Sequence, residues 1–253
     1  MKSYRAVLLD VEGTTTPISF VYETLFPYAR RNLGTFLREN WDDPEVRQDV
    51  ELVVQEAKEL ARDHADEPDF VPVPDHPPSD DVLRTSVVRH LEWQMERDLK
   101  TTGLKSIQGR VWKSGYTEGN LKAPVYEDVP EAFEVWDERD VPLHIYSSGS
   151  VEAQRLLFSN TERGDLTGAI DGYHDTRTGP KKEADSYRTI AESIGVSAGD
   201  IVFVTDDLDE ARAADEAGCQ AIISRRPGNP EIGDHDFEEI ETLNPVVDDG
   251  AGS

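Results

Sequence analysis

The sequence predicts an α/β fold, with a doubly wound, Rossmann-like parallel-sheet core and an inserted helical cap domain. Short apolar runs, separated by stretches of helix-like periodicity, indicate strands that are buried on both faces. These runs are Ala6–Leu9, Leu143–Tyr146, Ile201–Val204 and Gln220–Ile223. At 253 residues, the chain is long enough to bury a substantial core and still carry an inserted subdomain.

A long segment of different character separates the first two apolar runs. Phe20–Asn40, Asp43–Asp63 and Ser79–Thr101 carry apolar residues at helical spacing and contain no convincing strand. The segment is too long for an ordinary crossover, so we expect a helical cap over residues 19–124 and an α/β core from residues 1–18 and 125–253. The proline-rich stretch 65–81 is expected to form a loop within the cap.

The second half of the chain adds helices to the predicted core. Apolar periodicity predicts helices over Val151–Phe158 and Ser186–Ile194. Cys219 is the only cysteine, which excludes an intrachain disulfide, and we interpret it as a packed thiol. Pro, Gly and acidic residues dominate after residue 225. We therefore expect a last short element near residues 237–243 and a frayed tail over residues 244–253.

The charge balance restricts the possible partners. The chain carries 52 acidic and 26 basic residues, a net charge of −26, and only 8 of the bases are lysines. Such a surface repels nucleic acid and anionic membranes, and it disfavours self-association, so we expect a monomer. No signal-peptide or membrane-spanning segment is recognisable, which indicates a cytoplasmic protein. Abundant acids with few lysines further suggest a cytoplasm of high salt concentration.

Two acids follow the first predicted strand at once. Asp10 and Glu12 precede a turn that begins with Gly13. Residues i and i+2 of a strand face the same side, so both carboxylates can converge on one ligand at the strand end where open α/β sheets build active sites. On these residues alone, a polar strand end that leads into a loop explains the pattern equally well.

The other predicted strands also end in polar residues. Ser147-Ser148-Gly149-Ser150 follows the second strand at the start of a helix, where it forms either a phosphate site or a helix cap. Asp206 ends the strand that begins at Ile201 and is a candidate Mg²⁺ ligand, because Mg²⁺ prefers oxygen donors. The acids that follow, Asp209 and Glu210, are interpreted as first-turn residues that the helix dipole favours.

Lysine is rare in this chain, so the pair Lys181-Lys182 after a Gly-Pro turn attracts attention. Either lysine could neutralise a phosphate and a nucleophile. The histidines lie scattered without the spacing of metal ligands, and His144 is interpreted as a satisfied core or edge residue.

In chain order, these motifs resemble the four sequence motifs of the haloacid dehalogenase-like phosphatase superfamily. The resemblance covers roughly residues 4–18 and 125–225. A closer similarity, which includes part of the cap, links segments 10–21, 100–109, 125–130 and 147–150 to the bifunctional enolase-phosphatase (acireductone synthase) family of methionine salvage. The resemblance implies one Mg²⁺ organised by Asp10, Glu12 and Asp206, and a substrate held by Ser147, Ser148 and Lys181.

The same resemblance implies a reaction. The substrate would be the small phosphate ester 2,3-diketo-5-methylthiopentyl-1-phosphate, which is first enolised and then dephosphorylated to the acireductone. Asp10 would attack phosphorus and form an aspartyl-phosphate, and Glu12 would act as general acid and then as general base.

Two other functions stay open at this stage. A related phosphatase for another small phosphate ester would share every motif, and a non-catalytic phospholigand-binding module could use the same fold. A dinucleotide-dependent dehydrogenase is disfavoured, because no Gly-x-Gly-x-x-Gly follows the first strand.

Overall fold

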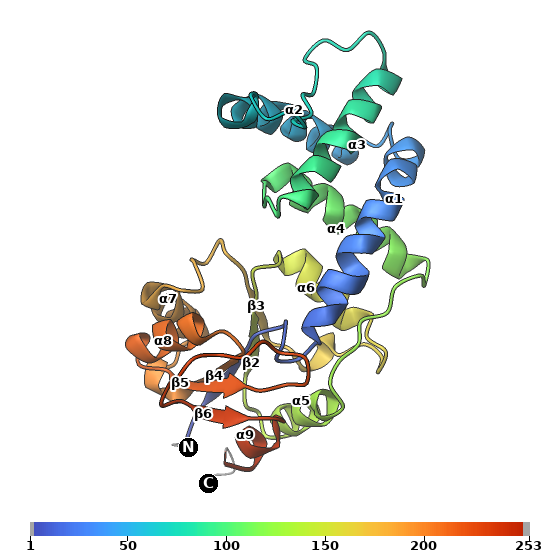
Figure 1. Ribbon diagram of the computed structural model, residues 1–253. Coiled ribbons are helices and arrows are strands. Elements are labelled where there is room, and N and C mark those ends of the chain that lie inside the picture. The colour runs from blue at the N-terminus through green and yellow to red at the C-terminus, as the bar shows by residue number, and fades with distance from the viewer. Residues whose placement is uncertain (1–2, 250–253) are drawn as a thin grey trace. The chain divides into compact units, whose positions relative to one another are not determined.

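The computed structural model describes residues 3–249. Within them the chain forms two compact units (Figure 1). One, called here the α/β unit, comprises residues 3–23 and 121–249, and the other, called the helical unit, comprises Thr24–Asn120. A π-helix, Phe20–Leu25, crosses from the first unit into the second.

The α/β unit is built on a parallel sheet with the strand order β3-β2-β1-β4-β5-β6. Its strands are β1 (Ala6–Leu9), β2 (Leu143–Tyr146), β3 (Gly172–His174), β4 (Ile201–Thr205), β5 (Gln220–Ser224) and β6 (Glu238–Ile240). β1 lies at the centre and is fully buried, as its apolar sequence requires. The predicted doubly wound α/β fold is confirmed, and the strand order reverses between β1 and β4.

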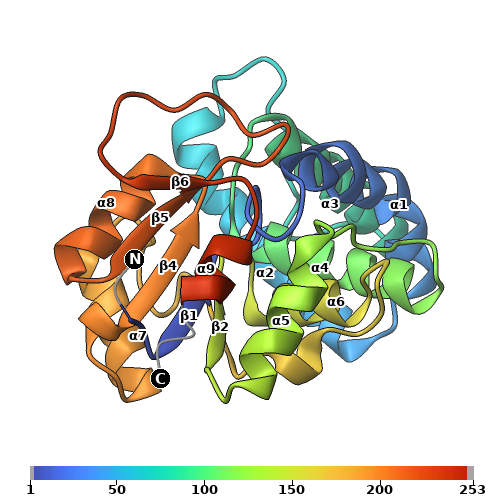
Figure 2. The same ribbon diagram turned by 90° about the horizontal axis from the view of Figure 1, so that it is seen from below.

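Helices cover both faces of this sheet (Figure 2). They are α5 (Asp128–Glu138), α6 (Val151–Ser159), α7 (Ala184–Ile194), α8 (Leu208–Ala217) and α9 (Asn244–Asp249), with short 3₁₀ turns at Thr167–Ala169 and Ala198–Asp200. α7 and α8 pack on one face and α5 and α9 on the other. Leu8, Tyr187 and Phe203 belong to the apolar cluster beneath α7 and α8, so this face carries a closed hydrophobic layer.

The structure corrects the prediction of a frayed tail. Residues 244–249 form α9, and Val246 is fully buried. Its backbone oxygen accepts a 2.7 Å hydrogen bond from the Tyr4 hydroxyl, which further fixes this helix. Composition alone missed this one buried apolar residue among acids. Residues 250–253 lie outside the described residues. β6 falls within the short element expected near residues 237–243. β3 was not predicted, because its sequence contains no apolar run.

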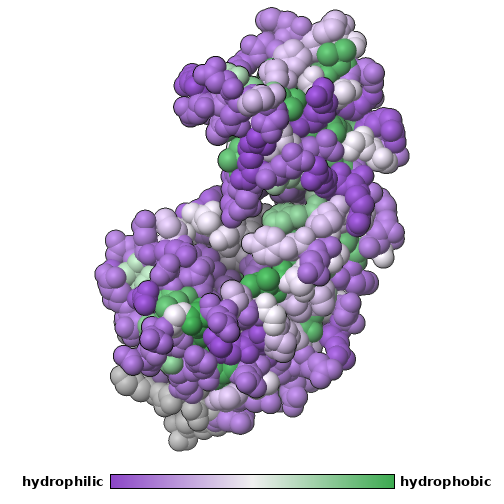
Figure 3. Space-filling model, viewed as in Figure 1, coloured by the Kyte–Doolittle hydropathy of each residue, from purple (hydrophilic) through white to green (hydrophobic). Residues whose placement is uncertain are grey.

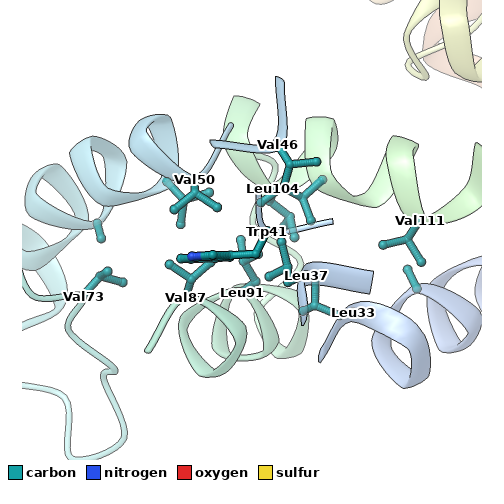
Figure 4. Packing of buried hydrophobic residues seen from close by; sticks show 14 residues of the cluster. Leu33, Leu37, Trp41, Val46, Val50, Val73, Val87, Leu91, Leu104 and Val111 are labelled. Atoms are coloured by element: carbon teal, nitrogen blue, oxygen red, sulfur yellow. The ribbon is translucent and has the colours of Figure 1, made fainter. Parts of the chain in front are cut away.

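The helical unit has a hydrophobic core of its own (Figure 4). Its helices are α1 (Phe26–Glu39), α2 (Pro44–His64), α3 (Asp80–Glu96) and α4 (Thr102–Thr117). Trp41, Val50 and Leu91 pack in its centre, and the Asp43 carboxylate caps the first turn of α2. The proline-rich residues 65–79 form no regular element, as predicted, whereas α4 was not anticipated as a helix.

The surface reflects the composition. Hydrophilic residues cover most of the face drawn in Figure 3. Over residues 3–249, we find no helix with the length and apolar character needed to cross a membrane.

Candidate active site

Asp10 continues the central strand beyond its last assigned residue. Its backbone N–H donates to the Val204 oxygen at 3.0 Å, so the β1–β4 pairing extends to Asp10. Its side chain therefore follows Ala6 and Leu8 onto the sheet face that α7 and α8 cover. The Asp10 carboxylate is buried, and it accepts a 2.8 Å hydrogen bond from the Val11 N–H.

The loop before α7 brings Lys181 to this carboxylate. Lys181 Nζ lies 2.6 Å from Asp10 Oδ1 and 2.7 Å from Glu210 Oε2. The Tyr187 hydroxyl donates to the Lys181 backbone oxygen at 2.7 Å and fixes the backbone from which the lysine extends. Burial alone would lower the Lys181 pKa, but the charges of Asp10 and Glu210 outweigh it and raise that pKa. Lys181 is therefore a buried, permanent cation.

The neighbouring lysine, Lys182, forms ion pairs with other acids. Lys182 Nζ lies 2.9 Å from Asp207 Oδ2 and 3.2 Å from Asp209 Oδ2, and its side chain is 55% exposed. Of the two candidates that the sequence offered, the structure brings only Lys181 to Asp10.

Glu12 lies in a tight turn that ends the strand geometry. The Val11 oxygen accepts from the N–H groups of Thr15 and Thr16 at 3.0 and 2.9 Å, and Gly13 adopts a φ of 69°, which an L side chain rarely tolerates. The turn aims Glu12 toward the end of β2, where Glu12 Oε2 accepts a 3.3 Å hydrogen bond from Ser147 Oγ. Asp10 and Glu12 thus reach different partners, one toward α7 and one toward β2.

Asp206 approaches the same turn from the end of β4. A Cβ added to Gly13 would lie 2.2 Å from Asp206 Oδ2, so the carboxylate rests directly on the glycine backbone. Burial, followed by the charges of Asp10 and Glu210, raises the Asp206 pKa to about 8. Burial and the charge of Asp10 also raise the Glu12 pKa. These carboxyl groups therefore share a region that is short of positive charge.

Glu210 is a site residue that the sequence interpretation missed. It was assigned to the helix dipole, yet its side chain is buried against Lys181, and burial with the charge of Asp10 raises its pKa to about 7. A signal was present, because Glu210 lies on the same face of α8 as Ala213 and Ala214, which are both buried. Asp209 on the opposite side is exposed, as expected for a first-turn acid.

Thr205 joins the two acids that flank Lys181. Its hydroxyl lies 3.2 Å from Asp10 Oδ2 and 2.9 Å from Glu210 Oε2, and it can donate to one of them at a time. It is fully buried as the last residue of β4.

The serine loop after β2 is only partly drawn into the cluster. Ser147 is buried and contacts Glu12, whereas Ser148 is exposed, and within residues 3–249 no hydrogen bond joins its side chain to the cluster. Ser150 caps α6 through the Ala153 N–H at 3.2 Å, so the helix-cap interpretation holds for this residue. The structure therefore brings together Asp10, Glu12, Ser147, Lys181 and Asp206 and leaves Ser148 at the rim.

The donor set fits a hard divalent cation. Asp10, Glu12, Asp206 and Glu210 supply carboxyl oxygens, and Lys181 is the cation that contacts Asp10 and Glu210. Among residues 3–249, no group of three or more His, Cys, Asp or Glu side chains is placed so that it could hold a metal ion by itself. Mg²⁺ does not need one, since it keeps several waters and takes one or two carboxylates with the substrate phosphate. Asp10 and Asp206 could serve in this way.

Comparison with known proteins agrees with the class that this fold and cluster define. The family model described as haloacid dehalogenase-like hydrolase matches residues 4–218. The chain also resembles the UTR4 protein of Saccharomyces cerevisiae, with a TM-score of 0.74 and 32% identity over 95% of this chain and 98% of that one. CbbY of Rhodobacter sphaeroides, with a TM-score of 0.56 at 15% identity, shares the fold.

Relatives of known name narrow the family. Enolase-phosphatase E1 of Synechococcus elongatus is 44% identical, with 94% of this chain and 98% of that protein covered. Enolase-phosphatase E1 of Persephonella marina is 41% identical, with 96% of this chain and 99% of that protein covered. The Anopheles gambiae protein of the same name is 42% identical, with 96% of this chain and 82% of that protein covered. The chain belongs to the haloacid dehalogenase-like hydrolases and, within them, to the enolase-phosphatase E1 family.

Proposed function

We propose that the chain is an Mg²⁺-dependent acireductone synthase, a phosphoric monoester hydrolase with enolase activity. It would enolise 2,3-diketo-5-methylthiopentyl-1-phosphate and hydrolyse the phosphate in methionine salvage. The substrate follows from the names of relatives that are similar over nearly their whole length. The structural observation that carries the phosphatase chemistry is the 2.6 Å contact between Lys181 Nζ and Asp10 Oδ1 at the end of the central strand.

In the first step, an Asp10 carboxylate oxygen attacks phosphorus while the bond to the substrate C1 oxygen breaks. The leaving oxygen takes a proton from Glu12, and an aspartyl-phosphate remains. Lys181 suits this step, because a buried ammonium beside the nucleophile offsets negative charge on the transferred phosphoryl group. Ser147 donates to Glu12 and so orients its carboxyl group.

In the second step, water attacks the phosphorus of the aspartyl-phosphate, and the Glu12 carboxylate accepts its proton. Inorganic phosphate leaves, and Asp10 regains its carboxylate. The turn that carries Glu12 starts at the residue after Asp10, so one short segment supplies both the nucleophile and the proton carrier.

We assign the metal to Asp10 and Asp206, with Glu12 as a third ligand through its side chain or its backbone oxygen. Bound Mg²⁺ would supply positive charge to the phosphate and enolate oxygens. A cation would be favoured here, since burial and then the charges of Asp10 and Glu210 raise the pKa of Asp206, and Lys181 offsets those charges only in part.

We further propose that residues 19–124 act as a cap for the substrate, and that the protein is a cytoplasmic monomer. Strong like charge at a net −26 supports the monomer. Size-exclusion chromatography with light scattering at near-physiological salt tests it, and a stable dimer would contradict it.

The decisive experiment incubates the protein with the diketo phosphate and MgCl₂, and follows phosphate release and the acireductone chromophore together. Wild-type protein should produce both. The Asp10→Asn variant should lose phosphate release by at least about a thousandfold, because an amide is a poor nucleophile. Its circular dichroism should match the wild type. Phosphate without chromophore would reduce the proposal to a phosphatase of other specificity, and full activity of Asp10→Asn would refute the mechanism.

A further inference from the structure

The turn after β1 is held from outside by another part of the chain. Two of its carbonyl groups, those of Gly13 and Thr14, accept no hydrogen bond within the turn. The Gly13 oxygen accepts from Ser224 Oγ and from Asn229 Nδ2, both at 2.9 Å, and the Thr14 oxygen accepts from Arg226 Nε at 3.1 Å. All of these donors come from the end of β5 and the loop that follows it.

Arg226 is itself rigidly held. Its guanidinium is buried and forms a bidentate ion pair with the Asp128 carboxylate of α5, with both N–O distances at 2.8 Å. Nη1 also donates to the Glu241 oxygen at 2.7 Å, and the group lies 4.5 Å from the centre of the Tyr126 ring. One side chain therefore ties the turn to α5 and to the segment after β6.

Asn229 links the same turn to Asp206. A Cβ on Gly13 would lie 2.9 Å from Asn229 Oδ1 and 2.2 Å from Asp206 Oδ2, so both side chains rest on this glycine. Asn229 Oδ1 is buried, and within residues 3–249 it has no hydrogen-bond partner. The post-β5 loop and the end of β4 thus meet across the glycine that follows Glu12.

We propose that Arg226 and Asn229 are positioning residues for catalysis. They fix the turn of residues 11–16, and through it they set where Glu12 and Asp206 stand relative to Asp10. The proposal rests on the proposed function, because it assigns to these residues the alignment of that machinery. Neither side chain contacts Asp10 or Lys181 within the described part of the chain.

Two substitutions test the proposal. Arg226→Lys keeps the charge that faces Asp128, but it lacks the planar guanidinium group that hydrogen-bonds to Asp128 and to the Thr14 oxygen at the same time. Asn229→Ala removes the amide donor to Gly13 and leaves the Arg226 ion pair untouched. If Arg226→Lys fails to fold, Asn229→Ala still decides.

Tyr4→Phe provides the matched control. It deletes buried hydrogen bonds in the same unit, from the Tyr4 hydroxyl to the Val246 oxygen at 2.7 Å and from Trp136 Nε1 to that hydroxyl at 3.0 Å. These bonds lie away from the turn, so Tyr4→Phe should lower stability without moving Glu12.

With the diketo phosphate and MgCl₂, both positioning variants should lower kcat about 10- to 100-fold and leave KM within about twofold, because supporting residues of this kind act on alignment. Tyr4→Phe should keep kcat within about twofold. In metal-free protein, amide hydrogen exchange at residues 13–16 should accelerate at least about tenfold in both variants, relative to exchange in β4. Tyr4→Phe should change the amide hydrogen exchange of residues 13–16 and that of β4 to the same extent.

Two results would overturn the positioning role. One is unchanged exchange at residues 13–16 in both variants, and the other is a kcat loss no larger than that of Tyr4→Phe. The exchange measurement needs no substrate. Wild-type protein that makes no acireductone would therefore refute the proposed function, whereas the exchange result would still decide whether Arg226 and Asn229 hold the turn.

Discussion

Lys181 Nζ lies 2.6 Å from Asp10 Oδ1 in a buried region that also holds the carboxyl groups of Glu210 and Asp206. An ion pair this deeply buried contributes modestly to stability as a pair, but loss of one partner leaves a buried charge uncompensated. The contact therefore makes Lys181 a structural necessity as well as a proposed phosphate ligand.

Lys181→Met should lower the free energy of unfolding of metal-free protein by about 3–5 kcal/mol at pH 8, because Asp10 and Glu210 lose their buried cation. The loss should be smaller at pH 6, where Glu210 takes up a proton more readily. Urea denaturation at both pH values measures it.

Lys182→Met is the matched control for this substitution. Lys182 forms only exposed ion pairs, so its loss should cost less than about 1 kcal/mol. Equal losses in the two variants would contradict the assignment of Lys181, rather than Lys182, to the buried cluster.

Gly13→Ala should damage the site more than its backbone strain alone explains. The new Cβ would lie 2.2 Å from Asp206 Oδ2, in a residue whose φ is 69°. Displacement of Asp206 should lower kcat by about a hundredfold and weaken Mg²⁺ binding, as misplaced groups of this kind do. Steady-state kinetics and Mg²⁺ titration followed by thermal shift measure both effects.

Gly164→Ala separates strain from displacement. Gly164 also has a positive φ, 101°, but nothing lies within 4 Å of an added Cβ. This substitution should lower the free energy of unfolding by about 1–2 kcal/mol and leave kcat unchanged. If Gly164→Ala lost activity to the same degree, the contact between Gly13 and Asp206 would not explain the effect.

Strands β1, β2, β4 and β5 could be predicted because each is a short apolar run, and Asp10 and Asp206 could be found because they follow two of those runs. Lys181 could be found because lysine is rare in this chain and a lysine pair follows a Gly-Pro turn. Glu210 was missed because an acid in a first helical turn has an ordinary explanation, and its contacts with Lys181, which is distant from α8 in the sequence, and with Thr205, which lies on β4, appear only in the folded chain. β3, with the sequence Gly-Tyr-His, carries no strand pattern of its own, and its pairing with β2 defines it. Contacts between distant segments, such as Arg226 with Thr14, leave no local pattern in the sequence.

Asp206 should make the metal-free protein less stable as pH rises. Its pKa is about 8 in the folded state against an ordinary 3.8, so between these values the folded state binds more protons than the unfolded state. The free energy of unfolding therefore falls as pH increases through this window, by about 1–3 kcal/mol between pH 6 and 8. Urea denaturation in EDTA at several pH values measures the slope.

Asp206→Asn should reduce this slope without abolishing it, because Glu210 also has a raised pKa, of about 7. Asp209→Asn, a change in an exposed acid of α8, should leave the slope intact. MgCl₂ should stabilise the wild type more at pH 8 than at pH 6, because the metal competes with the proton for the same carboxylate. Parallel curves for wild type and Asp206→Asn would exclude Asp206 as the group responsible.

Salt should stabilise the whole protein, because its net charge of −26 produces self-repulsion that ions screen. At pH 7.5, the midpoint of thermal unfolding should rise between 0.1 and 2 M KCl, with most of the gain below about 1 M, where the Debye length has already shrunk to about 3 Å. At pH 4.5, near the isoelectric point of about 4.5, the rise should vanish. A midpoint that ignores KCl at pH 7.5, or that rises equally at both pH values, would show that charge repulsion does not limit stability.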